Sequence, residues 1–288
     1  MCSKLPVYTA NLERMGDPVS SWKSEDVKHT LSKSKVHDQW IASFRTKENV
    51  RYFERALEHI LGIVKPESDA IFLDAGCGTC VKSILLAQRG FRTVALDFSE
   101  AVLEMAASEV EAHGFQDQIS LQREDITSLP FDNETFDHIV CWGVLMHIPD
   151  IETAMSELSR VVKKGGTITF AENNMFAVYA RLARGIKRIL GKHSTTANRT
   201  QSGIEDWVET DEGMILVRRM DMQWFKGSWR QRGFTIESHV AGQFTELYTR
   251  FTTPSLRLVI HWFNDVWFQY VKVPSPAFGN IVIVQKNS

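Results

Sequence analysis

The stretch that decides the fold is Leu73-Asp-Ala-Gly-Cys-Gly-Thr-Cys80, which overlaps the short apolar run Ala70-Ile-Phe-Leu-Asp74. An apolar run of this length that ends at glycines is typical of a buried strand entering a tight turn. Glycine at positions 76 and 78 lets the backbone turn sharply and approach a ligand with no Cβ in the way. Residues 81–89 then predict a helix, whose free N-terminal N–H groups suit an anionic group.

Strands and helices alternate through the rest of the chain. Further strands are predicted at 92–96, 119–121, 136–142, 167–170, 233–238 and 280–284, and helices at 100–112, 151–162 and 222–231. Strands that alternate with helices of this length form parallel sheets through right-handed crossovers, with helices on both faces. The sequence therefore predicts an α/β fold with a Rossmann-like, doubly wound, seven-stranded and mostly parallel sheet.

Several segments lie outside this alternation. Residues 1–35 are polar without a sustained period and predict a loose arm, whereas apolar residues at three- and four-residue spacing predict one or two amphipathic helices in 37–64. We divide the chain into an N-terminal arm and helical cover, 1–67, and one domain, 68–288. That domain carries cap insertions at about 173–220 and 241–278.

Composition limits the class of protein. The 288 residues are 43% hydrophobic, which is enough for one large domain, and 33 basic residues balance 35 acidic ones. This balance argues against a nucleic-acid partner. Four cysteines are too few for a secreted disulfide framework, and neither a signal peptide nor an apolar window of membrane-spanning length is visible. We expect a cytoplasmic protein.

An acid follows the glycine turn at an informative distance. Asp97 ends the second predicted strand, 21 residues after Gly76, where a carboxylate can accept hydrogen bonds from ribose hydroxyls. The turn and the acid together indicate an adenosine-containing ligand. Val81 stands where a dinucleotide fingerprint requires Gly or Ala, which disfavours NAD, and no Gly-Lys-Ser/Thr sequence provides a phosphate loop.

Five further motifs follow in order along the chain. They are Ala95-Leu-Asp-Phe-Ser99, Glu124-Asp-Ile-Thr-Ser-Leu-Pro-Phe131, Phe136-Asp-His-Ile-Val140, His147-Ile-Pro-Asp150 and Arg160-Val-Val-Lys-Lys-Gly-Gly166. With the glycine turn they resemble the class I S-adenosylmethionine-dependent methyltransferases, and most of all the subgroup that acts on small molecules and lipids. The resemblance covers roughly residues 68–172, with a fainter continuation through Arg232-Gly-Phe234.

The resemblance implies transfer of a methyl group from S-adenosyl-L-methionine to O, N or C of a small-molecule or lipid-like acceptor. It places Asp97 at the ribose hydroxyls, Phe98 beside the adenine, Asp125 at the adenine amino group, and Ile126 against the adenine through its backbone N–H and apolar side chain. The methionine end would be lined by Asp74, Gly76, Cys77 and Gly78, and the sulfonium would be faced by Cys141, Trp142 and Gly143. Cys80 departs from the family, which often has Gly there, and predicts crowding.

Other polar residues near the predicted strand ends have two interpretations each. His147 could take a proton from the acceptor or serve structurally at the start of the next helix. The fifth strand ends with Glu172, Asn173 and Asn174, on the edge where open α/β sheets bind ligands. These side chains would either face the substrate or belong to a loop without a role in binding.

The N-terminal cover and the cysteines also permit alternatives. In this family an N-terminal helix often closes over the cofactor, which would bring Trp40 into aromatic contact and Arg45 to the cofactor carboxylate, although simple packing explains Trp40 equally well. Cys77 and Cys80 have no second Cys/His pair at ligand spacing, so we predict no metal site.

The two insertions have contrasting compositions. Residues 175–192 carry five basic residues and no acid around an apolar stripe, which favours contact with a membrane surface or a cap helix with a solvated basic face. Residues 255–272 are apolar except for a narrow polar stripe, and we expect such a helix to bury most of its circumference. It would pack under the cap, form a homodimer interface or line a pocket for an apolar acceptor.

Three other functions are less compatible with the sequence than methyl transfer to a small molecule. No Asn/Asp-Pro-Pro-Tyr-type motif follows the fourth strand, which disfavours methylation of a nucleic-acid base. An NAD-dependent oxidoreductase is disfavoured by Val81 and by the Asp125-Ile126 pair. A non-catalytic cofactor-binding partner subunit is disfavoured by the intact binding motifs.

Overall fold

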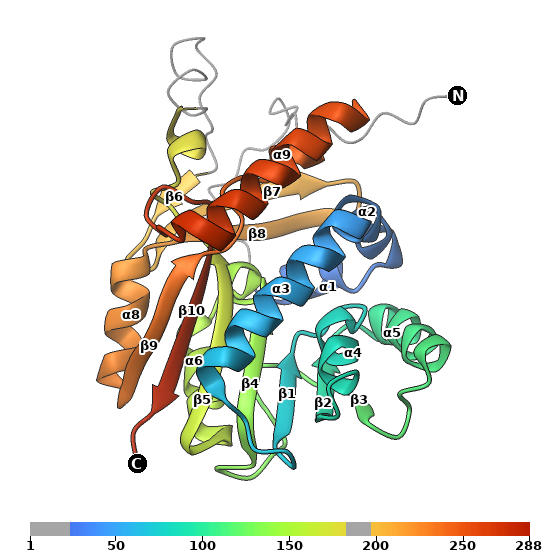
Figure 1. The fold of residues 1–288 in the computed structure, drawn as a ribbon, viewed down its shortest axis with the longest axis vertical. Coiled ribbons are helices and arrows are strands. Elements are labelled where there is room, and N and C mark those ends of the chain that lie inside the picture. The colour runs from blue at the N-terminus through green and yellow to red at the C-terminus, as the bar shows by residue number, and fades with distance from the viewer. Residues whose placement is uncertain (1–23, 183–196) are drawn as a thin grey trace.

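The central element of the computed structural model, which describes residues 24–182 and 197–288, is a seven-stranded sheet (Figure 1). Its strand order is β3-β2-β1-β4-β5-β10-β9, and only β10 runs antiparallel to its neighbours. The strands are β1 (Ile71–Ala75), β2 (Arg92–Asp97), β3 (Ile119–Arg123), β4 (Phe136–Trp142), β5 (Val162–Asn173), β9 (Phe234–Ala241) and β10 (Gly279–Lys286). The predicted Rossmann-like, mostly parallel sheet is confirmed.

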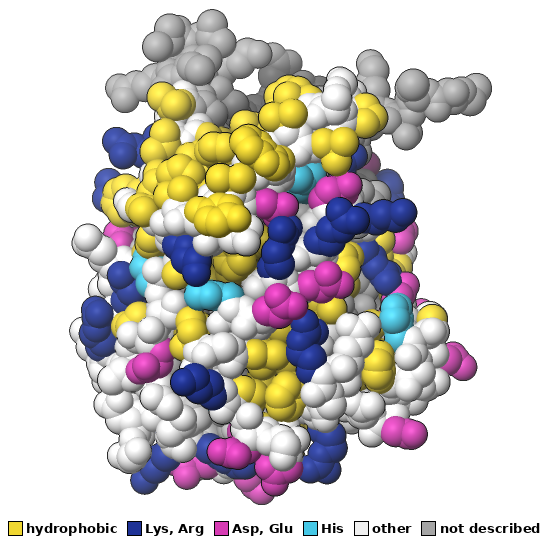
Figure 2. Space-filling view, in the orientation of Figure 1, with side chains coloured by type: hydrophobic (Ala, Val, Ile, Leu, Met, Phe, Trp, Pro, Cys, Tyr) yellow, Lys and Arg dark blue, Asp and Glu magenta, His cyan; other side chains and the backbone are white. Residues whose placement is uncertain are grey.

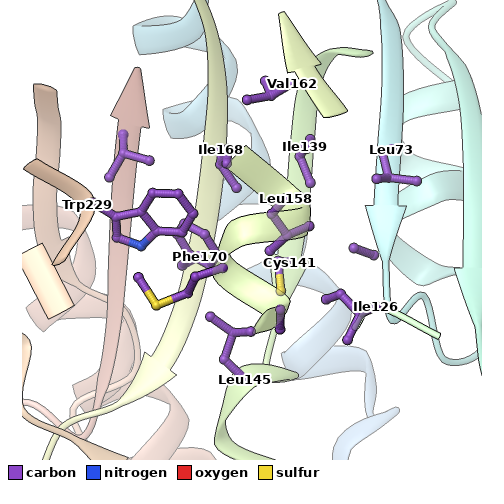
Figure 3. Packing of buried hydrophobic residues seen from close by; sticks show 14 of the residues in the cluster. Leu73, Ile126, Ile139, Cys141, Leu145, Leu158, Val162, Ile168, Phe170 and Trp229 are labelled. Atoms are coloured by element: carbon purple, nitrogen blue, oxygen red, sulfur yellow. The ribbon is translucent and has the colours of Figure 1, made fainter. Parts of the chain in front are cut away.

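Helices cover both faces of this sheet because side chains alternate along each strand. On one face Leu73, Ile139 and Phe170 pack against α6 and α8, together with the buried Trp229 (Figure 3). On the other face Phe72 and its neighbours pack against α3 and α4. The helices around the sheet are α3 (Lys47–Val64), α4 (Val81–Ala87), α5 (Glu100–His113), α6 (Ile151–Val161) and α8 (Met222–Gln231).

The N-terminal cover contains one helix more than expected. Helices α2 (Ser34–Phe44) and α3 confirm the predicted helical segment. The prediction of a loose arm is wrong for residues 24–31. They form helix α1 (Ser24–Leu31), in which Val27 and Leu31 are buried. This helix is stabilised by contacts with β8 rather than by a local pattern, because only two of its positions are buried apolar residues.

The first insertion contains a second, smaller sheet that the sequence analysis did not predict. Strands β6 (Ala197–Arg199), β7 (Gly203–Thr210) and β8 (Gly213–Met220) form this antiparallel sheet, which lies over one end of the large sheet (Figure 1). Of the basic amphipathic helix predicted at 175–192, residues 178–182 are helical and 183–192 lie outside the described residues.

The second insertion contains α9 (Pro254–Val266) and a π-helical turn η4 (Trp267–Val271), after a short 3-10 turn η3 (Leu247–Thr249). The expectation that this helix buries most of its circumference is wrong. Trp262 is 64% exposed and Val259 58%, whereas His261 and Asn264 are buried. Within the described part of the chain, no helix combines the length and apolar content needed to cross a bilayer.

Candidate active site

The glycine turn between β1 and α4 forms the floor of the candidate site. The N–H groups of Gly76 and Cys77 both donate to the carbonyl of Leu96, at 2.9 and 2.8 Å, which ties the turn to β2. Gly76 has φ +77°, and a Cβ there would lie 2.4 Å from Cγ2 of Val144. Gly78 has φ +54°, and a Cβ there would meet nothing within 4 Å. Packing therefore requires the first glycine, while the second borders open space.

Two buried carboxylates flank this turn. Asp97, at the end of β2, accepts the N–H of Gly78 at 3.2 Å and that of Ser99 at 3.1 Å, and burial raises its pKa. Asp74, at the end of β1, accepts the Ser83 hydroxyl at 2.6 Å through Oδ2, while its buried Oδ1 has no partner. Burial raises the pKa of Asp74 as well. A buried oxygen without a partner beside an open glycine fits a ligand that brings a polar or cationic group.

The predicted adenine side is occupied by a contact from the N-terminal cover. Asp125 accepts the N–H and hydroxyl of Thr127 at 2.9 and 2.8 Å, and Lys28 of α1 forms an ion pair with its other oxygen. Burial acts to raise the pKa of Asp125, but these bonds outweigh it and lower the pKa. Phe98 packs against the cluster of α1, α2 and β8, and Ile126 lies in the main core (Figure 3).

The three predicted site residues at the end of β4 have different surroundings. The Cys141 side chain lies in the main core, where burial raises the pKa of the thiol, so that only its backbone is available to a ligand (Figure 3). Trp142 points to the opposite face, with its ring edge-on to Tyr52 and Phe53 at 6.0 and 5.5 Å between centroids. Gly143 adopts φ +69° and donates to the carbonyl of Ala171.

His147 lies in the 3-10 turn η2 (Leu145–His147) and is held from two sides. Its Nδ1–H donates to the carbonyl of Leu216 in β8 at 2.6 Å, and its ring stacks on Trp40 with centroids 5.2 Å apart. Burial lowers the pKa of His147 to about 4, so the ring is neutral at pH 7 with Nε2 as acceptor. The predicted structural role at the start of α6 belongs instead to Asp150, which accepts the Thr153 N–H.

The polar side chains at the end of β5 have hydrogen-bond partners within the protein. Glu172 accepts the N–H groups of Leu145 and Met146 at 3.0 and 3.1 Å, and burial raises its pKa to about 8. Asn173 contacts the sulfur of Met146, and Asn174 donates to carbonyls of the segment before β10. The predicted substrate-facing role of these three residues is therefore unsupported, because their polar groups hold η2 and the second insertion in place.

Two further predictions meet a different geometry. Arg45 forms a bidentate ion pair with Glu109 of α5, which raises the pKa of Arg45 and leaves the predicted contact with a cofactor carboxylate unsupported. Cys80 lies not inside α4, as expected, but before it as the N-cap, where it is buried and has φ +61°. That left-handed conformation is the physical reason for glycine at this position in other proteins. No group of metal-ligating side chains occurs in residues 24–182 and 197–288.

A buried arginine in β8 was missed by the sequence analysis. Arg218 is 1% exposed and pairs with Glu205 of β7 at 2.8 Å. It also donates to the carbonyls of Leu145, Ile148 and Pro149, at 2.9, 2.8 and 3.3 Å. The small sheet therefore clamps the loop after β4. The sequence signal for this hairpin is the alternation of apolar and polar residues on both sides of the two-residue Asp-Glu turn at 211–212.

A group of polar and aromatic side chains beneath α9 was missed as well. Tyr248 donates to the Gln243 side chain, and its ring lies 4.3 Å from that of His261. Burial raises the pKa of the nearby Glu246 to about 7. Tyr52 lies between this insertion and the site. Its ring is edge-on to Trp142 at the end of β4 and to Phe268 of η4, at 6.0 and 5.6 Å.

The sequence is similar to those of known methyltransferases. A methyltransferase domain family matches residues 73–170. A demethylmenaquinone methyltransferase of Bacillus cytotoxicus is 28% identical over 204 residues, covering 68% of this chain and 79% of that protein. The Bacillus subtilis protein of the same name is 31% identical over 143 residues, covering 49% and 59%.

Solved structures share the fold at low sequence identity. An S-adenosylmethionine-dependent methyltransferase from Clostridium acetobutylicum has a TM-score of 0.59 and 15% identity, covering 88% of this chain and 98% of that one. A geranyl diphosphate methyltransferase in complex with SAM has a TM-score of 0.56 and 14% identity, covering 82% and 85%.

Proposed function

We propose that this chain, which the domain match and the curated relatives support as a class I S-adenosylmethionine-dependent methyltransferase, acts on a lipid-like small molecule with an aromatic head, such as a demethylmenaquinone-like quinol. The observation that carries this proposal is the cluster of aromatic side chains at the end of β4, in which Trp142 and Phe53 are only partly buried. Trp142, Tyr52, Phe53 and Phe268 form it, with neighbouring centroids 5.5–6.0 Å apart. Flat rings suit an aromatic acceptor, and the names of the Bacillus relatives support the same class.

The residues around the glycine turn fit the cofactor. We propose that the open space at Gly78 receives its methionine end, and that the unpartnered Oδ1 of Asp74 accepts from its ammonium group. Asp97 would bind the ribose hydroxyls, and Asp125 would bind the adenine amino group beside Phe98 in place of Lys28. When bound, S-adenosylmethionine supplies an electrophilic methyl carbon on a sulfonium, so the protein needs chiefly to align the acceptor and exclude water.

Removal of a proton from the acceptor is the one chemical step that a side chain could perform. We keep His147 as the proposed proton acceptor, through Nε2, because Nδ1–H is engaged by Leu216. A pKa of about 4 makes this imidazole a weak base, so its contribution to the rate should be small. Its contacts with Trp40 and β8 support a second role in positioning the loop after β4.

The proposed function is tested in two stages. Calorimetric titration of the wild type with S-adenosylmethionine, S-adenosylhomocysteine and NADH should show binding of the two sulfur compounds only. Asp97→Ala should abolish that binding, whereas Asp117→Ala, at an exposed site, should not change it. Preference for NADH would support the oxidoreductase instead.

The second stage identifies the acceptor. Transfer of radiolabelled methyl to a demethylated quinol, measured against a water-soluble catechol of similar head group, should favour the quinol. Tight cofactor binding without transfer to any acceptor would support the non-catalytic partner subunit.

The partner predictions for the insertions also stay proposals. We propose peripheral contact with the membrane in which a lipid-like acceptor resides. A homodimer through 255–272 is the rival occupant of the same surface.

A further inference from the structure

An extended apolar face is exposed over the two insertions. It consists of side chains that are 38–73% exposed, and Figure 2 shows hydrophobic side chains gathered over α9. We call this set the apolar face: Phe176, Val178, Leu182, Leu256, Leu258, Val259, Trp262, Phe263, Tyr270, Val271 and Val273. Contiguous apolar surface of this kind marks a site of interaction with a protein or a membrane.

The exposure of α9 is fixed by hydrogen bonds on its other side. Asn264 accepts the N–H of Thr245 and donates to its carbonyl, at 3.0 and 2.9 Å. Asp265 pairs with Arg55 of α3, and His261 lies under the Tyr248 ring. Turning the helix to bury its apolar side would break the buried contacts of Asn264 and His261 and the partly exposed ion pair of Asp265. The polar stripe therefore anchors α9, and the apolar side is presented outward.

The two insertions form this face together. The N–H of Val178 donates to the carbonyl of Pro276 at 3.1 Å, and Asn174 donates to the carbonyls of Ser275 and Ala277 at 2.8 and 3.1 Å. These bonds tie the start of the first insertion to the segment after α9. Its aromatic members include Trp262 and Tyr270, which are residue types enriched at membrane–water interfaces.

The charges of the segment that carries α9 are predominantly basic, although Glu48 of α3 lies close to Arg257 and Glu246 close to Arg250. Residues 250–273 contain Arg250, Arg257 and Lys272 against one acid, Asp265, which is already paired. Arg181 lies beside Leu182 in the other segment and is exposed. In a two-fold symmetric dimer this basic rim would face itself and be repelled. An anionic lipid surface complements both the apolar face and its rim.

We propose that the apolar face docks this protein on the surface of an anionic membrane. The face lies on the proposed acceptor side of the site, because Phe268 of η4, which directly follows α9, is separated from Trp142 only by the Tyr52 ring. Docking here would bring a membrane-resident acceptor to the end of β4. The docking itself does not require the acceptor proposed above, since it depends on residues outside the cofactor site.

Flotation of the full chain with lipid vesicles tests the proposal. Wild type should float with vesicles of phosphatidylglycerol and phosphatidylcholine at low salt, and much less with phosphatidylcholine alone or at high salt. The double variant V259S/W262S should bind at least about tenfold more weakly, because two side chains no longer enter the interface. W262F should retain binding, since it keeps an aromatic ring at the same position.

Charge variants separate the basic rim from a general effect of net charge. R181E should weaken vesicle binding by on the order of tenfold. K164E makes the same change in net charge at an exposed position near the start of β5 and should bind like wild type. Calorimetric binding of S-adenosylhomocysteine should be unchanged in all these variants, which shows that they are folded and keeps this test separate from that of the methyltransferase activity.

Three results would overturn the proposal. The first is that the wild type fails to float with vesicles of any composition. The second is that V259S/W262S and the wild type float equally. The third is a wild-type dimer in analytical ultracentrifugation that V259S/W262S converts to monomer without any vesicle binding. That outcome would assign the face to a second copy of this chain.

Discussion

The clamp formed by Arg218 makes the sharpest prediction about stability. Its side chain is 1% exposed, pairs with Glu205, and donates to three carbonyls of residues 145–149. Arg218→Met keeps most of the side-chain volume but removes every one of these bonds. The variant leaves Glu205, which is 17% exposed, without its cation.

The expected loss follows from these contacts. Removing one partner of a buried ion pair costs about 3–5 kcal/mol, because the remaining charge stays buried and unpaired. Three carbonyls that lose a charged donor would add about 1.5–3 kcal/mol each if no water replaced it, so 3–5 kcal/mol is the lower part of the range. At about 2–4 °C per kcal/mol, the midpoint of thermal unfolding should fall by roughly 6–20 °C.

Urea unfolding followed by fluorescence and hydrogen exchange measures this loss. Amides of β8 and of residues 145–149 should exchange much faster in the variant than amides of β1 and β4. Arg123→Met is the matched control, because Arg123 pairs with Glu100 at an exposed site. Its effect should stay within about 1 kcal/mol.

A double variant decides whether the buried charge is the cause. Replacing both partners, in E205M/R218M, should recover at least about half of the loss, because no unpaired charge remains. A loss below about 1 kcal/mol in R218M, or no recovery in the double variant, would refute the reasoning.

The remaining predictions concern the cofactor turn and pH. Gly76→Ala should destabilise the protein by about 2–5 kcal/mol in urea unfolding, because its Cβ meets Val144 and φ is positive. Gly78→Ala should cost only about 1–2 kcal/mol but weaken S-adenosylhomocysteine binding at least tenfold in calorimetry; the reverse order would contradict the assigned roles. Burial raises the pKa of Glu172 to about 8. Its protonated form therefore contributes to the free energy of unfolding in full below pH 4.5, and this contribution is lost as the pH rises through 8. Glu172→Gln should reduce the fall in stability between pH 5 and 8 by up to a few kcal/mol. Burial lowers the pKa of His147 to about 4, so this residue should not titrate near pH 6.5. The pH profiles of kcat for the wild type and for His147→Gln should therefore have the same shape around pH 6.5.

The large sheet could be predicted from the sequence because its signals are local. Each predicted strand is a short apolar run, and the turn at Gly76 and Gly78 fixes the first crossover. The small sheet was missed although Trp207 and Leu216 are buried in it. Its hairpin lacks glycine within the two-residue turn, and its strands carry charges such as Arg218 that are paired only in three dimensions.

The backbone of the site could be predicted, but the partners of its side chains could not. Position at a strand end placed Glu172 and Asn174 on the correct edge of the sheet, yet both bind backbone there. Arg45 pairs with Glu109, which is 64 residues away, and Asp125 pairs with Lys28, 97 residues away. Such contacts depend on how α1, α2 and α5 pack, and no local pattern determines that.

The helix α9 shows why apolar content alone does not identify the buried side of a helix. The usual inference assigns the wide apolar stripe to the core, because burying it is favourable. Here the narrow polar stripe finds partners for most of its groups, since Asn264 bonds the backbone N–H and carbonyl of Thr245 and Asp265 pairs with Arg55, while Nε2 of His261 has no partner. A polar stripe is buried at little cost when its groups are satisfied in this way. The apolar side is then left for another surface, and an inverted helix of this kind indicates contact with a partner or a membrane.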